Sequence, residues 1–149
     1  MKKLLPLALI LALLLSACGA PKDAIEGVTA ENYPRIDGSA DAMPLIQLVF
    51  EKVHTQYSGG DYPMEALGAE ASYKALLAGE LDLVIAPRPD ETVLAEAQSA
   101  GAELEARALE YGGLYAVTLA GLADDAPARL IADWLLSGEA AAEIEALAA

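Results

Sequence analysis

The heptapeptide LDLVIAP, residues Leu81 to Pro87, is a short apolar run that ends at a proline. Its β-branched residues and its brevity are typical of a buried strand. Strands of this kind belong to sheets that helices cover on both faces. The stretch therefore predicts an α/β protein if helices flank it.

Helical and strand-like segments do flank this run. A short β-prone segment around Tyr33 leads into a helix expected from about Ser39 to Thr55, where apolar residues recur at helical spacing. Further helices are expected at Ala66 to Leu77, Asp90 to Gly101, Pro127 to Leu136 and Glu139 to Leu147, and further strands at Glu103 to Tyr111 and Leu114 to Ala120.

This order predicts an α/β fold, a three-layer sandwich around a mostly parallel sheet. The sequence contains no internal repeat, and no linker follows residue 30. We therefore expect residues 31–149 to form a single α/β domain.

The first 17 residues have the pattern of a secretion signal. Two lysines precede an apolar run from Leu4 to Leu15, which is shorter than the ~20 residues that a membrane-spanning helix needs. The sequence LSAC, Leu15 to Cys18, resembles the lipobox of bacterial lipoproteins, in which the signal is cut before the cysteine and the cysteine is acylated. A lone structural cysteine is the alternative.

The resemblance to a lipobox implies a location. Cys18 would be the lipid attachment site, and residues 18–30 a tether between the lipid and the domain. The protein would then lie at the cell membrane of a bacterium, lipid-anchored on the extracytoplasmic face.

The charge of the chain limits its partners. Removal of Lys2 and Lys3 with the signal leaves seven basic against 23 acidic side chains, a net charge of −16. Such a surface repels phosphate backbones and anionic headgroups. We expect no nucleic-acid partner, and membrane association through the lipid anchor only.

Catalytic and metal-binding patterns are not found in the sequence. The single histidine, His54, lies at a helix C-terminus, where its positive form is favoured, and no serine stands in a G-x-S-x-G elbow. The acidic residues are spread over helix surfaces and are not clustered at the spacing of metal ligands. Trp134 lies among apolar residues of a helix and is expected in the core. We expect no enzyme activity, no metal and no cofactor.

Asp37-Gly38-Ser39 is the segment that carries a ligand hypothesis. A Gly-Ser turn between a strand and a helix lets backbone N–H groups approach an anion, while the Ser39 hydroxyl donates a further hydrogen bond. Ser39 as a plain helix N-cap would give the same sequence. The segment by itself leaves both interpretations open.

Three segments together resemble a known family. They are YPRIDGSADAMPL, SYKALLAGELDLVIAP and YGGLYAVTLAGLADDAPARLIADWLLSGEAA. In this order they resemble parts of the phosphate-binding, PstS-like group of periplasmic substrate-binding lipoproteins, and the lipobox agrees with that group. The resemblance implies a domain like one lobe of a type II periplasmic binding protein.

The resemblance also implies a ligand and its contacts. Family members hold inorganic phosphate between two lobes and pass it to an ABC importer, so phosphate or a similar oxyanion and an ABC permease are the implied partners. The contacts carried over are Gly38, Ser39 and the amide of Ala40, with Arg88 placed near the site from the loop after Leu81 to Pro87.

The chain departs from the family in three ways. Ala40 stands where a hydroxyl residue is common, Asp41 adds a negative charge beside the expected anion, and nearly all of the second lobe is missing after Leu109. A one-lobed site leaves most oxygens of the ligand open to water, which competes for their hydrogen bonds, so binding is expected to be weak. The alternative is an anchored envelope interaction module with no small-molecule ligand.

Overall fold

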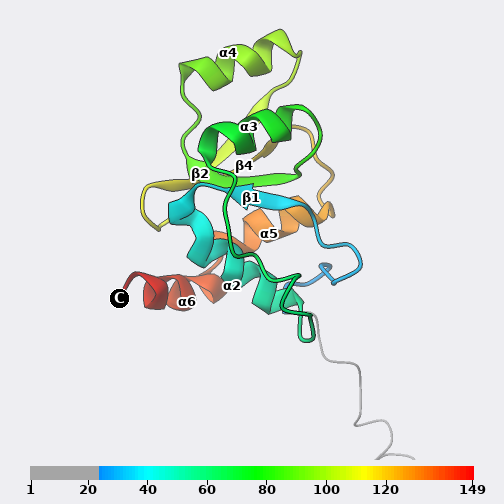
Figure 1. The fold of residues 1–149 in the computed structure, drawn as a ribbon, viewed down its shortest axis with the longest axis vertical. Coiled ribbons are helices and arrows are strands. Elements are labelled where there is room, and N and C mark those ends of the chain that lie inside the picture. The colour runs from blue at the N-terminus through cyan, green and yellow to red at the C-terminus, as the bar shows by residue number, and fades with distance from the viewer. Residues whose placement is uncertain (1–23) are drawn as a thin grey trace, which may run out of the picture.

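The computed structural model describes residues 24–149 as a sheet with helices on both faces (Figure 1). The expected signal peptide and Cys18 lie outside the described residues. The elements, in chain order, are β1 (Ile36–Gly38), the 3-10 helix η1 (Ala40–Ala42), α2 (Met43–Val53), α3 (Ala69–Leu77), β2 (Leu83–Pro87), α4 (Glu91–Ser99), β3 (Leu104–Ala108), β4 (Leu114–Leu119), α5 (Pro127–Leu135) and α6 (Gly138–Ala148).

The elements expected from the sequence are present, with ends that differ by a few residues. The largest difference is in the first helix, which begins as the 3-10 turn η1 and becomes α-helical only at Met43. Pro44 is then in the first turn of α2, where its missing N–H removes no helix hydrogen bond.

The expectation of a mostly parallel sheet is wrong. The strand order is β1-β2-β4-β3, in which β1 and β2 are parallel while β4 is antiparallel to both of its neighbours. Gly112 and Gly113, both with positive φ, turn the chain between β3 and β4 and so make these strands a hairpin. The apolar β4 takes the interior position, and the charged β3 takes the edge.

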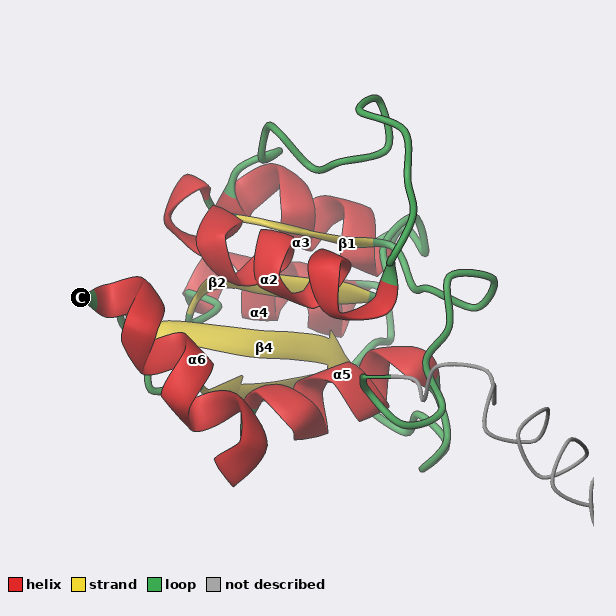
Figure 2. Cartoon of the chain, turned by 90° about the horizontal axis from the view of Figure 1, so that it is seen from below, coloured by secondary structure: helices red, strands yellow, loops and turns green. Residues whose placement is uncertain are grey.

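The three-layer arrangement is confirmed. Leu83 and Ile85 of β2 point into a core formed with α2, α5 and α6, whereas Val84 and Ala86 point into a second core formed with α3 and α4. Figure 2 shows α2, α5 and α6 on the viewer's side of the sheet. The apolar run buries alternate residues in each core, as a strand covered on both faces must.

The domain boundary expected at residue 31 has to be moved toward the N-terminus. Ile25 and Val28, placed by the sequence in a tether, are buried in the core that contains α5. Asn32 holds this segment in place, because its side chain donates to Gly27 O at 3.0 Å and accepts from Thr29 N at 2.7 Å. The packed part of the chain therefore includes residues of the segment expected to be a tether.

Two residues that could have belonged to a site have structural roles. Trp134 is buried in the core, as expected. His54 is the C-cap of α2, its Nδ1 lies 3.1 Å from Phe50 O, and its ring stacks on Phe50 with centroids 4.0 Å apart. The histidine therefore lies where its packing and capping account for it.

One ion pair joins the starts of the two parallel strands and predicts a pH effect. Arg35 Nε and Nη2 donate to the Asp82 carboxylate at 3.0 and 2.9 Å, and Arg35 N donates to it at 2.8 Å. The side-chain hydrogen bond from Arg35 is the largest cause that lowers the pKa of Asp82 below 3.8. The stabilisation by this ion pair is therefore fully present above the ordinary pKa of 3.8, and it is lost as the pH falls through the lowered pKa of Asp82.

We expect Asp82→Asn to lower the free energy of unfolding by less than about 1 kcal/mol at pH 7, because the pair is partly exposed. The difference from wild type should shrink when urea unfolding is repeated near pH 2. Asp125→Asn is the control, since Asp125 is exposed and makes no ion pair among residues 24–149. An equal loss at both pH values would contradict this assignment.

Candidate functional site

The junction between β1 and η1 holds three of the residues expected to bind an anion. Gly38 ends β1, Ser39 occupies the N-cap position with φ −77° and ψ 161°, and Ala40 begins η1. Ser39 O accepts the amide of Ala42 at 3.0 Å. The turn therefore has the strand-to-helix form that the sequence predicts.

Gly38 is required by packing between strands. A Cβ on Gly38 would lie 1.8 Å from Ile85 O, so no side chain fits between β1 and β2 at this point. Its amide donates to Asp37 Oδ1 at 2.8 Å, and its carbonyl accepts Gly68 N at 3.0 Å and Ser72 Oγ at 3.3 Å. The amide of Gly38 is thus already bonded within the chain.

Ser39 presents one used donor and one unused donor. Its amide donates to Ile85 O at 3.0 Å, which extends the contact between β1 and β2. Its side chain makes no capping hydrogen bond, and Oγ is buried without a partner among the described residues. Since buried hydroxyls in native proteins are nearly always paired, this Oγ is the unusual group at the junction.

Ala40 lies at the surface beside an open hollow. Its amide has no acceptor in the part of the chain that the structure describes. The hollow has a volume of about 650 Å³ and is also lined by Asp41, Pro44, Tyr111, Gly112, Leu147 and Ala148. The end of α6 and the β3–β4 turn therefore form the wall opposite η1. Asp41 brings the negative charge that the sequence places there.

Arg88 lies elsewhere. It is exposed, and it lines a pocket of about 380 Å³ between α3 and α4 that does not include the junction residues. Glu70, Asp90 and Glu96 line the same pocket, and Tyr73 donates its hydroxyl to Pro87 O at 2.6 Å. The structure therefore brings Gly38, Ser39 and Ala40 together but places Arg88 among acidic side chains.

Comparisons with known proteins give a partial match. No protein-family model and no curated protein matches the chain. Among solved structures, the chain is similar to "The crystal structure of a possible phosphate binding protein from Planctomyces limnophilus DSM 3776", with 24% sequence identity and a TM-score of 0.37. The match covers 52% of this chain and 28% of that chain.

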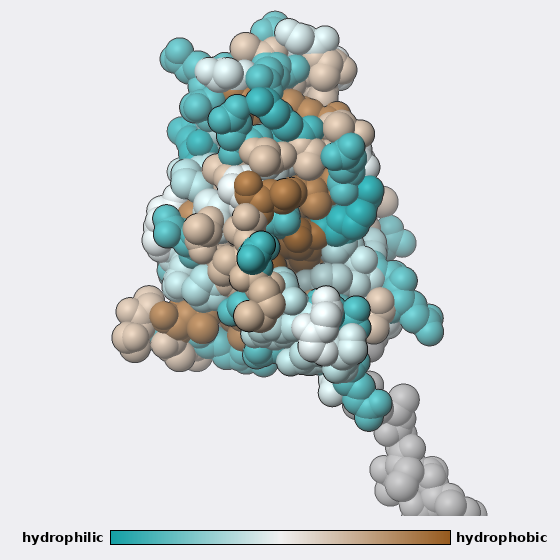
Figure 3. All heavy atoms as spheres, viewed as in Figure 1, coloured by the Kyte–Doolittle hydropathy of each residue, from teal (hydrophilic) through white to brown (hydrophobic). Residues whose placement is uncertain are grey.

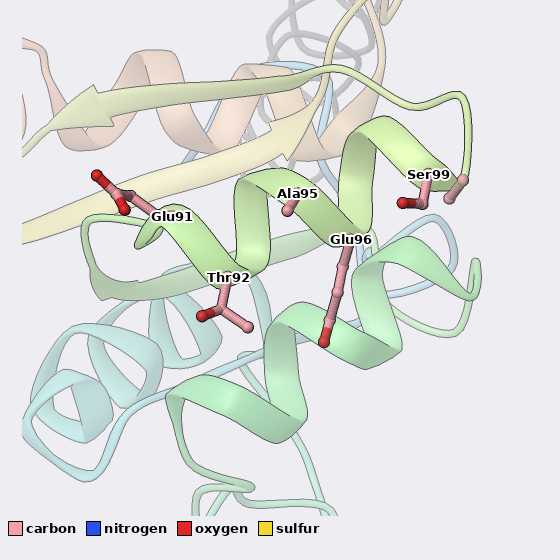
Figure 4. Close-up of a pocket in the computed structure, with 6 residues that line it drawn as sticks. Glu91, Thr92, Ala95, Glu96 and Ser99 are labelled. Atoms are coloured by element: carbon pink, nitrogen blue, oxygen red, sulfur yellow. The ribbon is translucent and has the colours of Figure 1, made fainter.

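The surface of α4 has a hollow but no set of convergent groups. It measures about 690 Å³ and is lined by Glu91, Thr92, Ala95, Glu96, Ser99 and Ala100. Figure 4 shows that the labelled side chains come from one helix. Within the described part of the chain, no opposing element supplies a second set of contacts, so this surface offers less to a ligand than the junction.

Residues 24–149 contain neither a metal-ligand cluster nor a helix that could span a membrane. No three His, Cys, Asp or Glu side chains are grouped as a metal site would require. None of the helices in this range is long and apolar enough to span a membrane.

The junction also contains contacts that the sequence did not predict. Asp37 Oδ1 accepts the amides of both Gly38 and Leu67, at 2.8 and 2.9 Å. Leu147 reaches the hollow from the far end of the chain. No local signal in the sequence could have located the end of α6 beside this turn.

Proposed function

We propose that this protein is a lipid-anchored, solute-binding-type domain that binds a small oxyanion such as phosphate weakly at the β1–η1 junction. In this proposal it binds without turnover and serves import by an ABC permease. Cys18 carries the lipid and holds the domain on the extracytoplasmic face of the membrane.

The observation that carries the proposal is the buried hydroxyl of Ser39, which has no partner within residues 24–149. An oxygen of a tetrahedral anion would accept a hydrogen bond from Ser39 Oγ, and a second oxygen could accept from the amide of Ala40. The 3-10 turn leads directly into α2, so the positive end of that helix dipole lies close by.

The same geometry explains why binding should be weak. The amides of Gly38 and Ser39 are bonded to Asp37 and Ile85, so two of the donors implied by the family resemblance are not available. Asp41 would repel an anion, and Ser39 Oγ becomes accessible only after a local opening of the junction. We therefore expect dissociation constants on the order of 1 mM, not the tight binding of a closed two-lobed site.

The test is thermal unfolding of wild type and of Ser39→Ala with increasing phosphate. Wild type should gain stability as phosphate is raised through the millimolar range, because a ligand that binds only the folded state stabilises it. Ser39→Ala should lose this gain while remaining folded. Its stability without phosphate should equal or exceed that of wild type, because an unpaired buried hydroxyl has been removed.

Ser99→Ala is the matched control, since Ser99 is exposed on α4 and far from the junction in sequence. It should keep the phosphate response of wild type. Sodium chloride at matched ionic strength separates binding from general salt effects. If wild type gains nothing from phosphate beyond the salt control, the oxyanion proposal is wrong.

Two observations favour a second candidate, an anchored interaction module without a small ligand. The chain itself uses the amides of Gly38 and Ser39, and the α2–α3 connection exposes Tyr57, Met64 and Leu67. Figure 3 shows an apolar area on the face over which this connection runs. Such a surface is typical of protein contacts. This candidate predicts that no anion stabilises wild type.

A further inference from the structure

The outer edge of β3 is one of the two edges of the sheet. β3 is the last strand in the order β1-β2-β4-β3, and among residues 24–149 it pairs with β4 on one side and with no strand on the other. It contains no proline, and its pairing with β4 is regular over its whole length. An edge of this kind presents unpaired backbone N–H and C=O groups to a further strand.

The hydrogen bonds at the two ends of the hairpin identify the groups that face outward. Ala120 N donates to Glu103 O at 2.8 Å, and Leu109 N donates to Leu114 O at 2.9 Å. Hydrogen-bonded and non-hydrogen-bonded positions alternate along an antiparallel pair. Glu105 and Arg107 therefore bond to β4, and the backbone groups of Leu104, Ala106 and Ala108 point away from the sheet.

The side chains of this edge are self-complementary. Glu105 and Arg107 are two residues apart and so lie on the same face of the sheet. We propose that β3 pairs antiparallel with β3 of a second copy of this chain, about a two-fold axis at Ala106. Leu104 then lies opposite Ala108 of the other copy, and each Glu105 lies opposite an Arg107.

This register makes use of both the backbone and the charges. Leu104, Ala106 and Ala108 form hydrogen-bonded pairs with the second copy, so all the outward groups of the strand are satisfied. Glu105 and Arg107 fall in non-hydrogen-bonded positions, where opposite side chains are closest. Arg107 also contacts Asp133, but a guanidinium has enough donors to serve both carboxylates.

Shifted registers are disfavoured by charge. Moving the two-fold axis to Glu105 places two glutamates opposite each other, and moving it to Arg107 does the same with two arginines. Like charges directly opposite each other destabilise a strand pair. The exposed Ala106 and Ala108 present no bulky side chains to a second strand.

The contact is small and the chain is strongly acidic, with a net charge of −14. A weak, reversible dimer is therefore expected, at protein concentrations of roughly 0.1 to 1 mM. The interface is isologous and joins two sheets into one continuous sheet. It does not involve the oxyanion site, so a negative result for one proposal leaves the other unaffected.

Cysteine cross-linking of the full chain tests the register. In Ala106→Cys, the two introduced cysteines lie directly opposite each other. Their Cα atoms are about 5.5 Å apart, which is within the range for a disulfide. In the matched control Ala108→Cys, the two thiols are separated by roughly 13 Å along the strands. Mild oxidation should convert Ala106→Cys to a covalent dimer well above the background of wild type, which retains Cys18, and should leave Ala108→Cys at that background.

Charge variants test the pairing independently. Glu105→Arg alone and Arg107→Glu alone each place like charges opposite each other, and each should associate about tenfold more weakly than wild type. An equimolar mixture of the two restores both opposite-charge pairs and should form a heterodimer at the wild-type level, measured by analytical ultracentrifugation. Circular dichroism of each variant checks that the domain is folded.

Equal cross-linking of Ala106→Cys and Ala108→Cys would overturn the proposal, and so would the absence of cross-linking in both. Either charge variant associating by itself as strongly as the mixture would also overturn it.

Discussion

Replacement of Gly38 by alanine is expected to lower the free energy of unfolding by at least about 3 kcal/mol. The added methyl group would lie 1.8 Å from Ile85 O, which is far inside van der Waals contact. The obstacle is backbone in a central strand and not a flexible side chain, so it has little room to move. β1 would have to separate from β2, with loss of the hydrogen bond from Ser39 N to Ile85 O.

Gly59→Ala is the control for this variant. Nothing lies within 4 Å of a Cβ at Gly59, and its backbone does not require glycine. Its stability should stay within about 0.5 kcal/mol of wild type. Urea unfolding can be followed by the fluorescence of Trp134, the single tryptophan, which is buried. Similar stabilities for the two variants would show that β1 does not lie against β2 as described.

Replacement of Leu83 by alanine is expected to cost about 2 to 5 kcal/mol. Leu83 is 0% exposed at the start of β2 and belongs to the core formed with α2, α5 and α6. The surrounding helices cannot close around the lost atoms without moving relative to the sheet, so a cavity is left. A domain of this size has a total stability of only about 5 to 15 kcal/mol, and the variant would be only marginally folded if the stability lies at the low end.

Leu94→Ala makes the same chemical change on α4, where the side chain is 49% exposed. We expect a loss of less than about 1 kcal/mol, because much of this side chain is in water in the folded state. Because both variants replace leucine by alanine, the difference between their free energies of unfolding in urea reports the effect of burial. Equal losses at the two positions would contradict the assignment of β2 to the centre of the sheet.

The sequence predicted the positions of the helices and strands because their signals are local. The apolar run around Val84 and Ile85, the helical spacing of Leu45, Ile46 and Val49, and the glycines that end segments all act within a few residues. The same signals identified Trp134 as a core residue. The ends of the helices and strands differ by a few residues from those expected. The burial of Ile25 and Val28 was not predicted, because two apolar residues in a short segment show no periodicity.

The candidate site was predicted only in part. The turn Gly38-Ser39-Ala40 lies between a strand and a helix as expected, but Arg88 enters a different pocket. Both follow parallel strands, and the sequence offered no indication that α3 and α4 would surround Arg88 with acidic side chains. The partner of each amide could not be predicted either, because Ile85 meets Ser39 only through the pairing of distant strands.

The sequence by itself determined that this protein is an α/β domain with a Gly-Ser turn before a helix, because secondary structure follows from patterns among near neighbours. Only the tertiary structure decided the mixed strand order, the use of the Gly38 and Ser39 amides within the chain, and the lack of a partner for Ser39 Oγ among the residues that the structure describes. These features depend on which distant residue lies opposite each group after folding, and that is set by packing over the whole domain.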